Sequence, residues 1–291
     1  MNKTSKFMTL ALATALMAAS CGSDAESTSA SSETTDASSA ATCDMANLPL
    51  HAAGTLTVAT GEEVYPPWMT FGDPAAGGGF ESELVFALAD QLGVGRDHVE
   101  WVGTGFDEAI LAGEKNYDFN IQQYSITPER SAVVDFSDGY YDVEQAIVAI
   151  DGSAIAGATS IADLKDAKIG AAIGTTSLTY AEDVIAPADG VAVYDDNAAA
   201  KAAFDAGQLD GMVFDLPTAY YVTAVEFENS SIIGILPRQG EADQLGMLFE
   251  KGSPLVGCVN EALAALRSDG TLESLENEFL SAGGSIPTFT E

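Results

Sequence analysis

The strongest constraint on the fold of this 291-residue chain is a series of alternating β-rich and helical patterns that ends and then begins again. The first series opens with TLTVAT at residues 55–60, places five apolar residues on one helical face of residues 80–93, and continues with a β-rich run at 98–103. A second series begins near residue 160. This alternation predicts an α/β fold in which each lobe has a central, mostly parallel sheet flanked by helices.

Extended segments at residues 147–153 and 238–245 separate the two series, and we expect the chain to cross between lobes there. Lobe 2 would then be inserted into lobe 1. The predicted domains are residues 43–150 with 244–291 for lobe 1, and residues 151–243 for lobe 2. Because open α/β sheets bind ligands beyond the carboxyl ends of their strands, we expect a ligand cleft between the lobes.

Residues 1–20 have the features of an export signal: Lys3 and Lys6 precede an apolar run that is too short to span a bilayer. The AASCG that follows resembles the lipobox of bacterial lipoproteins, which implies that Cys21 is acylated and anchors an extracytoplasmic protein to the cell membrane. The alternative is an ordinary cleaved signal with an incidental cysteine. Residues 21–42 are mostly Ser, Thr and Ala and predict a flexible tether with a reach of roughly 25 Å.

The two other cysteines, Cys43 and Cys258, are expected to form a disulfide, because exported proteins pair their thiols in an oxidising environment. The alternative is two buried free thiols.

The chain is strongly acidic, with 44 Asp and Glu against 11 Lys and Arg and a formal net charge of −33. Loss of the signal would remove two lysines and lower the charge from −33 to −35. Such a body repels nucleic acid and anionic lipid, so neither is an expected partner. The charge also favours a secreted protein in salty surroundings. The sequence has no Cys or His spacing typical of a metal site and its acids are dispersed, so we expect no metal and no other cofactor.

Arg130 is one of only four arginines, and it lies in SITPER, where Thr127 and Pro128 predict the start of a helix. A cation is unfavourable at a helix N-terminus, so an anion should join it. One candidate is an internal acid: Glu129, Asp135 or Asp138. The other is a ligand carboxylate, which a guanidinium can hold with two parallel hydrogen bonds while Ser125 supplies another.

Two strand-to-helix junctions in the second series carry further candidates. IGTTS presents Thr175 and Thr176 at a helix N-terminus, where they either cap the helix or bind an anion. GMVFDLP ends a strand in Asp215, which either caps the next helix or pairs with an ammonium group. A cationic and an anionic contact across one cleft predict a zwitterionic ligand.

Six segments in order, from about residue 55 to residue 280, resemble the extracellular amino-acid-binding proteins of ABC importers, the family 3 solute-binding proteins. These segments are TVATGEEVYPPW, GFESELVFALADQLG, SITPERSAVVDFSDGYY, IGTTS, GMVFDLPTAY and VNEALAALRSDGTLESLENEFL. The resemblance implies a type II periplasmic-binding-protein fold, with two lobes and a two-stranded hinge. It also implies closure on one amino acid, delivery to a membrane permease and no catalysis. We expect a monomer.

The resemblance also implies roles for individual residues, which share one pocket. Arg130 would bind the ligand carboxylate with Thr176 and Thr175, and Asp215 would bind the ammonium group. The remaining contacts would come from Gln123 through its main chain, Ser125 through its hydroxyl, and Tyr65, Phe106 and Trp68 as aromatic walls. The sequence departs from many members at Gln122, Gln123 and Tyr124, where small or Gly-Met residues are usual.

Glu62 and Gln122 favour a polar or basic ligand side chain, since similar proteins place an acid at the position of Glu62. The alternative for Glu62 is a solvated loop acid. The aromatic residues of YPPW have an alternative as well, a turn whose rings belong to the core.

The rival function is an enzyme. The same fold resembles that of periplasmic cyclohexadienyl dehydratases, which release water from arogenate or prephenate. Against this, neither His51 nor His98 is placed for proton transfer by the sequence pattern, although a carboxylic acid could serve instead.

Overall fold

The computed structural model describes residues 43, 46–240, 242–281 and 285–291. The predicted signal, the lipidation at Cys21 and the tether at 21–42 lie outside these residues. Within them, no helix has the length and apolar character needed to cross a bilayer.

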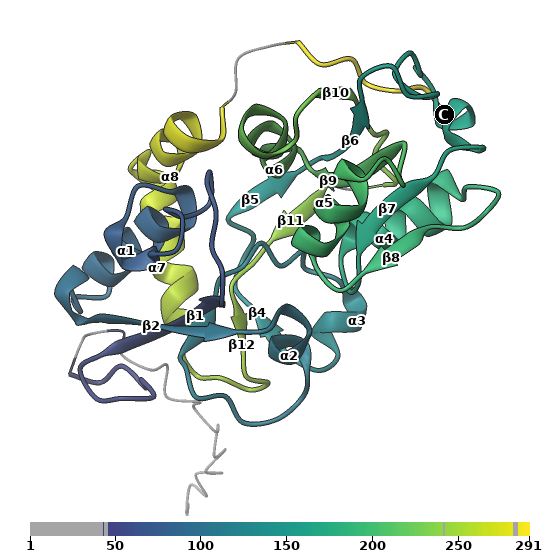
Figure 1. Ribbon diagram of the computed structural model, residues 1–291. Coiled ribbons are helices and arrows are strands. Elements are labelled where there is room, and N and C mark those ends of the chain that lie inside the picture. Colours follow the sequence, from purple (N-terminus) through teal and green to yellow (C-terminus); the bar gives the residue numbers. More distant parts are fainter. Residues whose placement is uncertain (1–42, 44–45, 241, 282–284) are drawn as a thin grey trace, which may run out of the picture. The chain divides into compact units, whose positions relative to one another are not determined.

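The first sheet has the strand order β2-β1-β3-β12-β4 (Figure 1). β1 pairs in parallel with β2 and β3, and β12 pairs antiparallel with β3 and β4. Every residue of β1 is buried, as expected for a central strand covered on both faces. The strands are β1 Leu56–Gly61, β2 Val99–Thr104, β3 Phe119–Asn120, β4 Asp135–Phe136 and β12 Leu248–Phe249.

The main core of this part forms where α1 packs against α7 and α8, and it includes Phe80, Leu84, Leu88, Val259 and Leu263. α1 was predicted from this apolar face, and the structure confirms it. The helices are η1 Pro74–Ala76, α1 Phe80–Gln91, η2 Arg96–His98, α2 Phe106–Ile110, α3 Pro128–Ser131, α7 Val256–Ser268, α8 Thr271–Leu275 and η6 Glu276–Leu280.

The second sheet has the order β10-β6-β9-β7-β8 and is mixed: β7 is parallel to β8 and β9, whereas β6 is antiparallel to β9 and β10. Successive residues of β6 enter different cores: Ile147 and Ala149 belong to one cluster, Ala146 and Val148 to another. The sheet is therefore covered on both faces. The strands are β6 Gln145–Ile150, β7 Ile169–Ala172, β8 Ala192–Tyr194, β9 Gly211–Asp215 and β10 Ser230–Ile235.

Two of the helices beside this sheet continue from an α-helical half into a π-helical half, α4 into η4 and α6 into η5. The helices are η3 Ile161–Leu164, α4 Thr176–Tyr180, η4 Ala181–Ile185, α5 Asn197–Asp205, α6 Leu216–Tyr221 and η5 Val222–Glu226.

A two-stranded antiparallel pair, β5 Tyr141–Val143 with β11 Asp243–Leu245, lies between the two sheets along the chain. The first crossover therefore comes earlier than the predicted segment at 147–153, because residues 145–150 are the buried strand β6 of the second sheet. The domain boundaries stay a prediction. β6 falls on the lobe 1 side of the boundary placed at residue 150.

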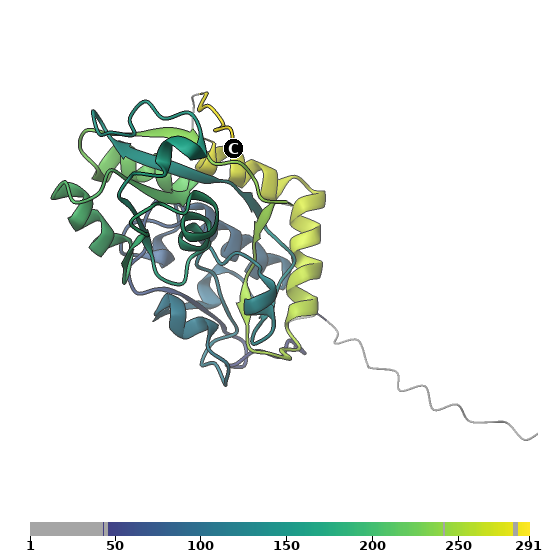
Figure 2. The ribbon, with the colours of Figure 1, turned by 90° about the vertical axis from the view of Figure 1, so that its right-hand side faces the viewer.

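The chain returns to the second sheet at its C-terminal end, as the last segment in Figures 1 and 2 shows. Thr288 forms a bridge with Ile235 and Thr290 forms one with Ser160. Phe289, between them, is buried in a core of the second sheet. The described part of the chain thus reaches the second sheet first at β6 and again at residues 288–290.

Two local expectations differ from the structure. The sequence FDEAILAGEKN predicts a helix over residues 106–116, but the helix ends at Ile110, where Leu111 adopts extended backbone angles and is 64% exposed. After Ile110 the sequence LAGEKN offers no apolar face to bury, so further turns of helix would gain little from packing. The short strand β4 was not predicted, because two residues carry no periodic signal.

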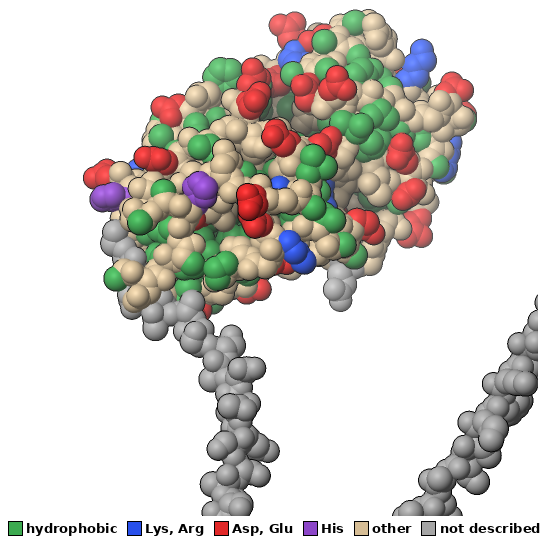
Figure 3. All heavy atoms as spheres, turned by 90° about the horizontal axis from the view of Figure 1, so that it is seen from below, with side chains coloured by type: hydrophobic (Ala, Val, Ile, Leu, Met, Phe, Trp, Pro, Cys, Tyr) green, Lys and Arg blue, Asp and Glu red, His purple; other side chains and the backbone are tan. Residues whose placement is uncertain are grey.

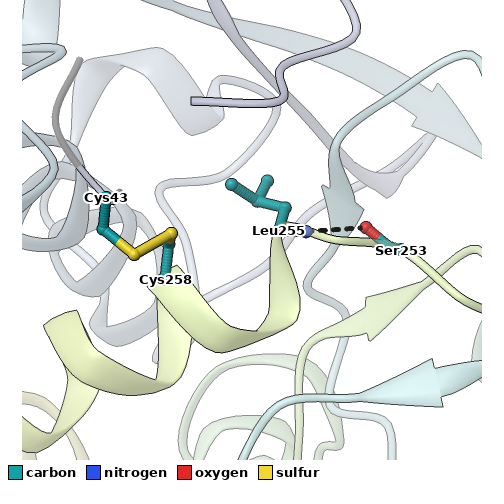
Figure 4. Close-up of a disulfide and its surroundings, with 4 residues drawn as sticks. All are labelled: Cys43, Ser253, Leu255 and Cys258. Atoms are coloured by element: carbon teal, nitrogen blue, oxygen red, sulfur yellow. Dashed lines mark hydrogen bonds between the residues drawn. A yellow bond between two sulfur atoms is a disulfide. The ribbon is translucent and has the colours of Figure 1, made fainter. Parts of the chain in front are cut away.

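The disulfide between Cys43 and Cys258 is confirmed (Figure 4). Cys258 lies on the buried face of α7, so the bond fixes residue 43 to the first-sheet core. The bond closes a loop with a sequence separation of 215 residues.

Replacing both cysteines by serine should lower the free energy of unfolding by about 2 to 5 kcal/mol, because the unfolded chain regains the freedom that the long loop removes. Urea unfolding of the two proteins under oxidising conditions measures this difference. Addition of a reductant should destabilise the wild-type chain and leave the double variant unchanged. Equal stability of both proteins would contradict a structural role for the bond.

Candidate functional site

Strand ends from both sheets meet at one place. Segments after β3 and β7 contact one another directly: the Ser125 hydroxyl lies 3.2 Å from that of Thr176, and Arg130 Nη2 donates to the Gly174 carbonyl at 2.8 Å. Both contacts join residues that follow strands of different sheets. This is the position at which open α/β sheets offer ligand sites.

Arg130 is buried in the first turn of α3, where Thr127 caps the helix and Pro128 begins it, as predicted. Its guanidinium donates to the carbonyls of Ser125 at 2.7 Å and Gly174 at 2.8 Å. Among the described residues, Arg130 forms no ion pair within 4.0 Å. The internal salt bridge considered from the sequence is absent there, and Asp135 pairs with Lys251 instead.

Aromatic rings and more distant acids surround this guanidinium. Its central carbon lies 5.4 Å from the ring centre of Phe106 and 5.9 Å from that of Tyr124, within cation–π range. Burial lowers the pKa of Arg130, and the charges of Asp215, Asp107 and Asp243 oppose that shift.

Asp215 ends β9 and makes no capping hydrogen bond to α6, so the capping interpretation does not hold for its side chain. Its carboxylate accepts a hydrogen bond of 2.5 Å from Gln145 Nε2, and the Ser177 hydroxyl donates to the same amide at 2.7 Å. Burial raises the pKa of Asp215 to about 6, while the Gln145 hydrogen bond and the Arg130 charge lower it. The carboxylate is thus ionised at neutral pH, with no cation paired to it among the described residues.

The two threonines differ. Thr175 caps α4: its hydroxyl accepts from Leu178 N at 3.1 Å and donates to the Ala172 carbonyl at 2.8 Å. Thr176 instead directs its hydroxyl at Ser125 on the first sheet.

The aromatic candidates separate into two groups. Phe106 stacks on Tyr124 with ring centres 4.5 Å apart, and Tyr65 is partly exposed with its hydroxyl donating to Glu63. Trp68 is 4% exposed and packs in the first-sheet core beside Phe80, in line with the interpretation that placed this ring in the core. Its indole Nε1 donates to the Thr218 hydroxyl of α6 at 3.0 Å, so Trp68 links the two sheets.

Glu62 is exposed, and Gln122 accepts a hydrogen bond of 3.1 Å from the Tyr124 hydroxyl. Acidic side chains are scattered over the visible face in Figure 3, where Lys and Arg are fewer. An exposed acid in such a surface is not distinctive by itself. No group of three or more His, Cys, Asp or Glu suitable for a metal occurs among the described residues.

Sequence reasoning missed Glu81 and Gln145, which support the site. Glu81 is fully buried on α1, and both the backbone N–H and the side-chain amide of Gln123 donate to its carboxylate. A signal existed: residue 81 precedes Leu84, Val85 and Leu88 by three, four and seven positions, so this acid occurs on the predicted apolar face. Gln145 carries no comparable signal, because its role depends on pairing with Asp215 on the neighbouring strand.

Comparison with known proteins identifies the family of this chain. The chain matches the bacterial extracellular solute-binding proteins, family 3, over residues 56–282. It is 30% identical over 231 residues to an L-arginine-binding protein of Pseudomonas aeruginosa, covering 76% of this chain and 86% of that protein.

Two solved structures of amino-acid-binding proteins are also similar to this chain. An ancestral arginine-binding protein bound to glutamine has a TM-score of 0.65 and 30% identity, covering 80% of this chain and 100% of that one. An ancestral amino acid-binding protein described as a precursor of cyclohexadienyl dehydratase has a TM-score of 0.62 and 30% identity, covering 78% of this chain and 96% of that one. The chain belongs to the family 3 extracellular solute-binding proteins, with the type II periplasmic-binding-protein fold and relatives named for the amino acids they bind.

Proposed function

We propose that this protein captures one free amino acid between its two sheets and delivers it to the permease of an ABC importer. The observation that carries the proposal is the buried guanidinium of Arg130, which has no carboxylate partner among the described residues. Burying a cation without a counter-ion costs several kcal/mol, so a ligand carboxylate is its natural partner.

Arg130 retains donors for that ligand. A guanidinium has five N–H groups, and the two carbonyls of Ser125 and Gly174 take one each. The remaining N–H groups and the hydroxyls of Ser125 and Thr176 are the donors we assign to the ligand carboxylate. Thr175 would act indirectly, as the cap of α4.

Asp215 supplies the opposite charge. Gln145 orients its carboxylate, and its pKa of about 6 keeps it ionised at neutral pH. We assign it the ligand ammonium, with the main chain of Gln123 and the hydroxyl of Ser125. A ligand that lacks the ammonium would leave Asp215 desolvated and unpaired, so we expect selectivity toward zwitterions.

For the ligand side chain we propose a polar or basic group. One relative named above is an L-arginine-binding protein, and the ancestral arginine-binding protein is bound to glutamine. Tyr65 and Phe106 would flank this side chain, and Glu62 and Gln122 would face its polar end. Trp68 contributes through its contact with Thr218 rather than as a wall.

We further propose that the protein acts outside the cytoplasm as a monomer, held to the membrane through Cys21, and that it is not an enzyme. A dehydratase is the competing function, because one similar ancestral protein is described as a precursor of such an enzyme. Against it, both His51 and His98 are exposed.

A thermal-shift screen of the twenty amino acids, with L-ornithine and L-cystine added, tests the proposal. An amino acid at a hundredfold excess over its dissociation constant should add about 2.7 kcal/mol of stability, and we expect the largest shift with a polar or basic one. Calorimetry then measures Kd, expected in the micromolar range. A flat screen would contradict amino-acid binding. Conversion of arogenate or prephenate would favour the dehydratase.

Arg130→Ala should weaken binding of the amino acid found in the screen by a factor of about 100 or more, because at least two charge-assisted hydrogen bonds are lost. Arg96→Ala is the matched control, since Arg96 pairs with Glu83, lies over the Phe86 ring and donates to the Ala76 carbonyl, none of which is a proposed site residue. Calorimetry compares both variants with wild type at pH 8. An unchanged Kd for Arg130→Ala would exclude the guanidinium from the site.

Trp68→Phe should raise Kd up to about tenfold and speed dissociation, because closure would lose the hydrogen bond from Nε1 to Thr218. Stopped-flow fluorescence or calorimetry measures both effects. Trp101→Phe is the control, since the Nε1 atom of Trp101 has no hydrogen-bond partner in the described part of the chain. Equal Kd values for the two variants would show that the Trp68 contact does not favour closure.

A further inference from the structure

Glu81 is a fully buried carboxylate that is bound only by neutral donors. The backbone N–H of Gln123 donates to it at 2.9 Å, and the Gln123 side-chain amide and the Tyr140 hydroxyl donate as well. No Lys or Arg of the described chain pairs with it. A buried charge without a counter-ion is costly, so the position needs a reason beyond packing.

The residue that Glu81 holds has an unusual backbone conformation. Gln123 has φ of +51°, in the left-handed region that residues other than glycine rarely adopt. The backbone N–H and the side-chain amide of Gln123 both donate to the Glu81 carboxylate, so Glu81 stabilises this backbone conformation. Gln123 is two residues before Ser125, whose carbonyl binds Arg130 and whose hydroxyl faces Thr176.

Glu81 also reaches the strands that join the two sheets. The fully buried ring of Tyr140 lies directly before β5, and its backbone N–H donates to the Leu245 carbonyl of β11 at 2.8 Å. The Glu81 carboxylate, at the start of α1, thus holds both Gln123, close to Ser125, and Tyr140, directly before the β5–β11 pair.

We propose that ionised Glu81 is a positioning residue that holds Gln123 in the conformation required to bind the amino-acid ligand. This inference rests on the proposed function. The Glu81 carboxylate does not contact the ligand. It sets where the Gln123 main chain and the Ser125 hydroxyl meet the ligand ammonium.

Charge state distinguishes this role from a purely structural one. Burial raises the pKa of Glu81 from an ordinary 4.5 to about 7, and the hydrogen bonds from Tyr140 and Gln123 oppose this rise. The titratable groups around it are Tyr140, Tyr124 and Asp215. Because the folded state binds this proton more tightly than the unfolded state, Glu81 lowers stability as pH rises from 4.5 to 7. A charge that favours ligand binding at the expense of stability should have opposite effects on affinity and on stability.

The test uses Glu81→Gln, which keeps the shape and removes the charge. Calorimetry at pH 8, with L-arginine as first probe or else the amino acid of largest thermal shift, should give a Kd about tenfold above wild type. Without ligand, the Tm of the variant minus the Tm of the wild type should increase by a few degrees between pH 5 and pH 8, because only the wild type loses stability as Glu81 ionises. Weaker binding together with this gain is the expected result.

Two further variants keep the test decisive. Tyr140→Phe removes one donor and should weaken binding in the same direction but less. Asp118→Asn alters a buried carboxylate that likewise accepts backbone N–H groups, from His51 and Thr57, but lies outside the site, so it should lower Tm and leave Kd unchanged.

The outcomes separate this inference from the proposed function. If the wild-type chain binds an amino acid and Glu81→Gln binds it with the same Kd, the positioning role is overturned and the proposed function is not. A Tm difference that does not vary with pH would overturn the ionised state on which it depends. Absence of amino-acid binding by the wild-type chain would contradict the proposed function and this inference together.

Discussion

The buried guanidinium of Arg130 is the interaction on which the rest of the site depends. Carbonyl groups of both sheets accept its hydrogen bonds, Ser125 from one side and Gly174 from the other, so one side chain joins the two halves of the fold. Carbonyl groups ease the burial of a cation without neutralising it. The positive charge therefore stays available to an anion, while Asp215 stays available to a cation.

Several acids lie near Arg130 in this acidic chain without pairing with it. Asp107, Asp215 and Asp243 all interact electrostatically with Arg130, yet none forms an ion pair with it. A pair at closer range would occupy the donors that we assign to the ligand in the proposed function. The geometry keeps the opposite charges of the site apart, and burial strengthens the attraction that each has for a ligand.

The alternation of strands and helices could be predicted because each element repeats an apolar pattern that its own residues carry. The predictions failed where structure depends on partners. α2 ends early because nothing packs on its continuation, and the first crossover lies before β6 because that strand pairs in the centre of the second sheet. Arg130 and Asp215 became candidate site residues through local reasoning about helix ends, and their roles stay a prediction. The Trp68 contact with Thr218 joins residues 150 positions apart, and no local pattern marks it.

Glu81 illustrates a third case, in which the sequence contains the signal but not its interpretation. An acid on an apolar helix face indicates a buried charge, yet its partners come from residues 123 and 140. Only the folded chain shows that these donors come from Gln123, two residues before Ser125, and from Tyr140, directly before β5.

The C-terminal segment changes how the two sheets can move. Residues of α7 and α8 pack in the first-sheet core, and Phe289, later in the chain, is buried in the second-sheet core. The C-terminal part of the chain is therefore attached to both sheets, in addition to the β5–β11 pair. Any movement of the first sheet away from the second should therefore leave residues 285–291 with the second sheet, and a polypeptide fused after Glu291 would begin beside that sheet.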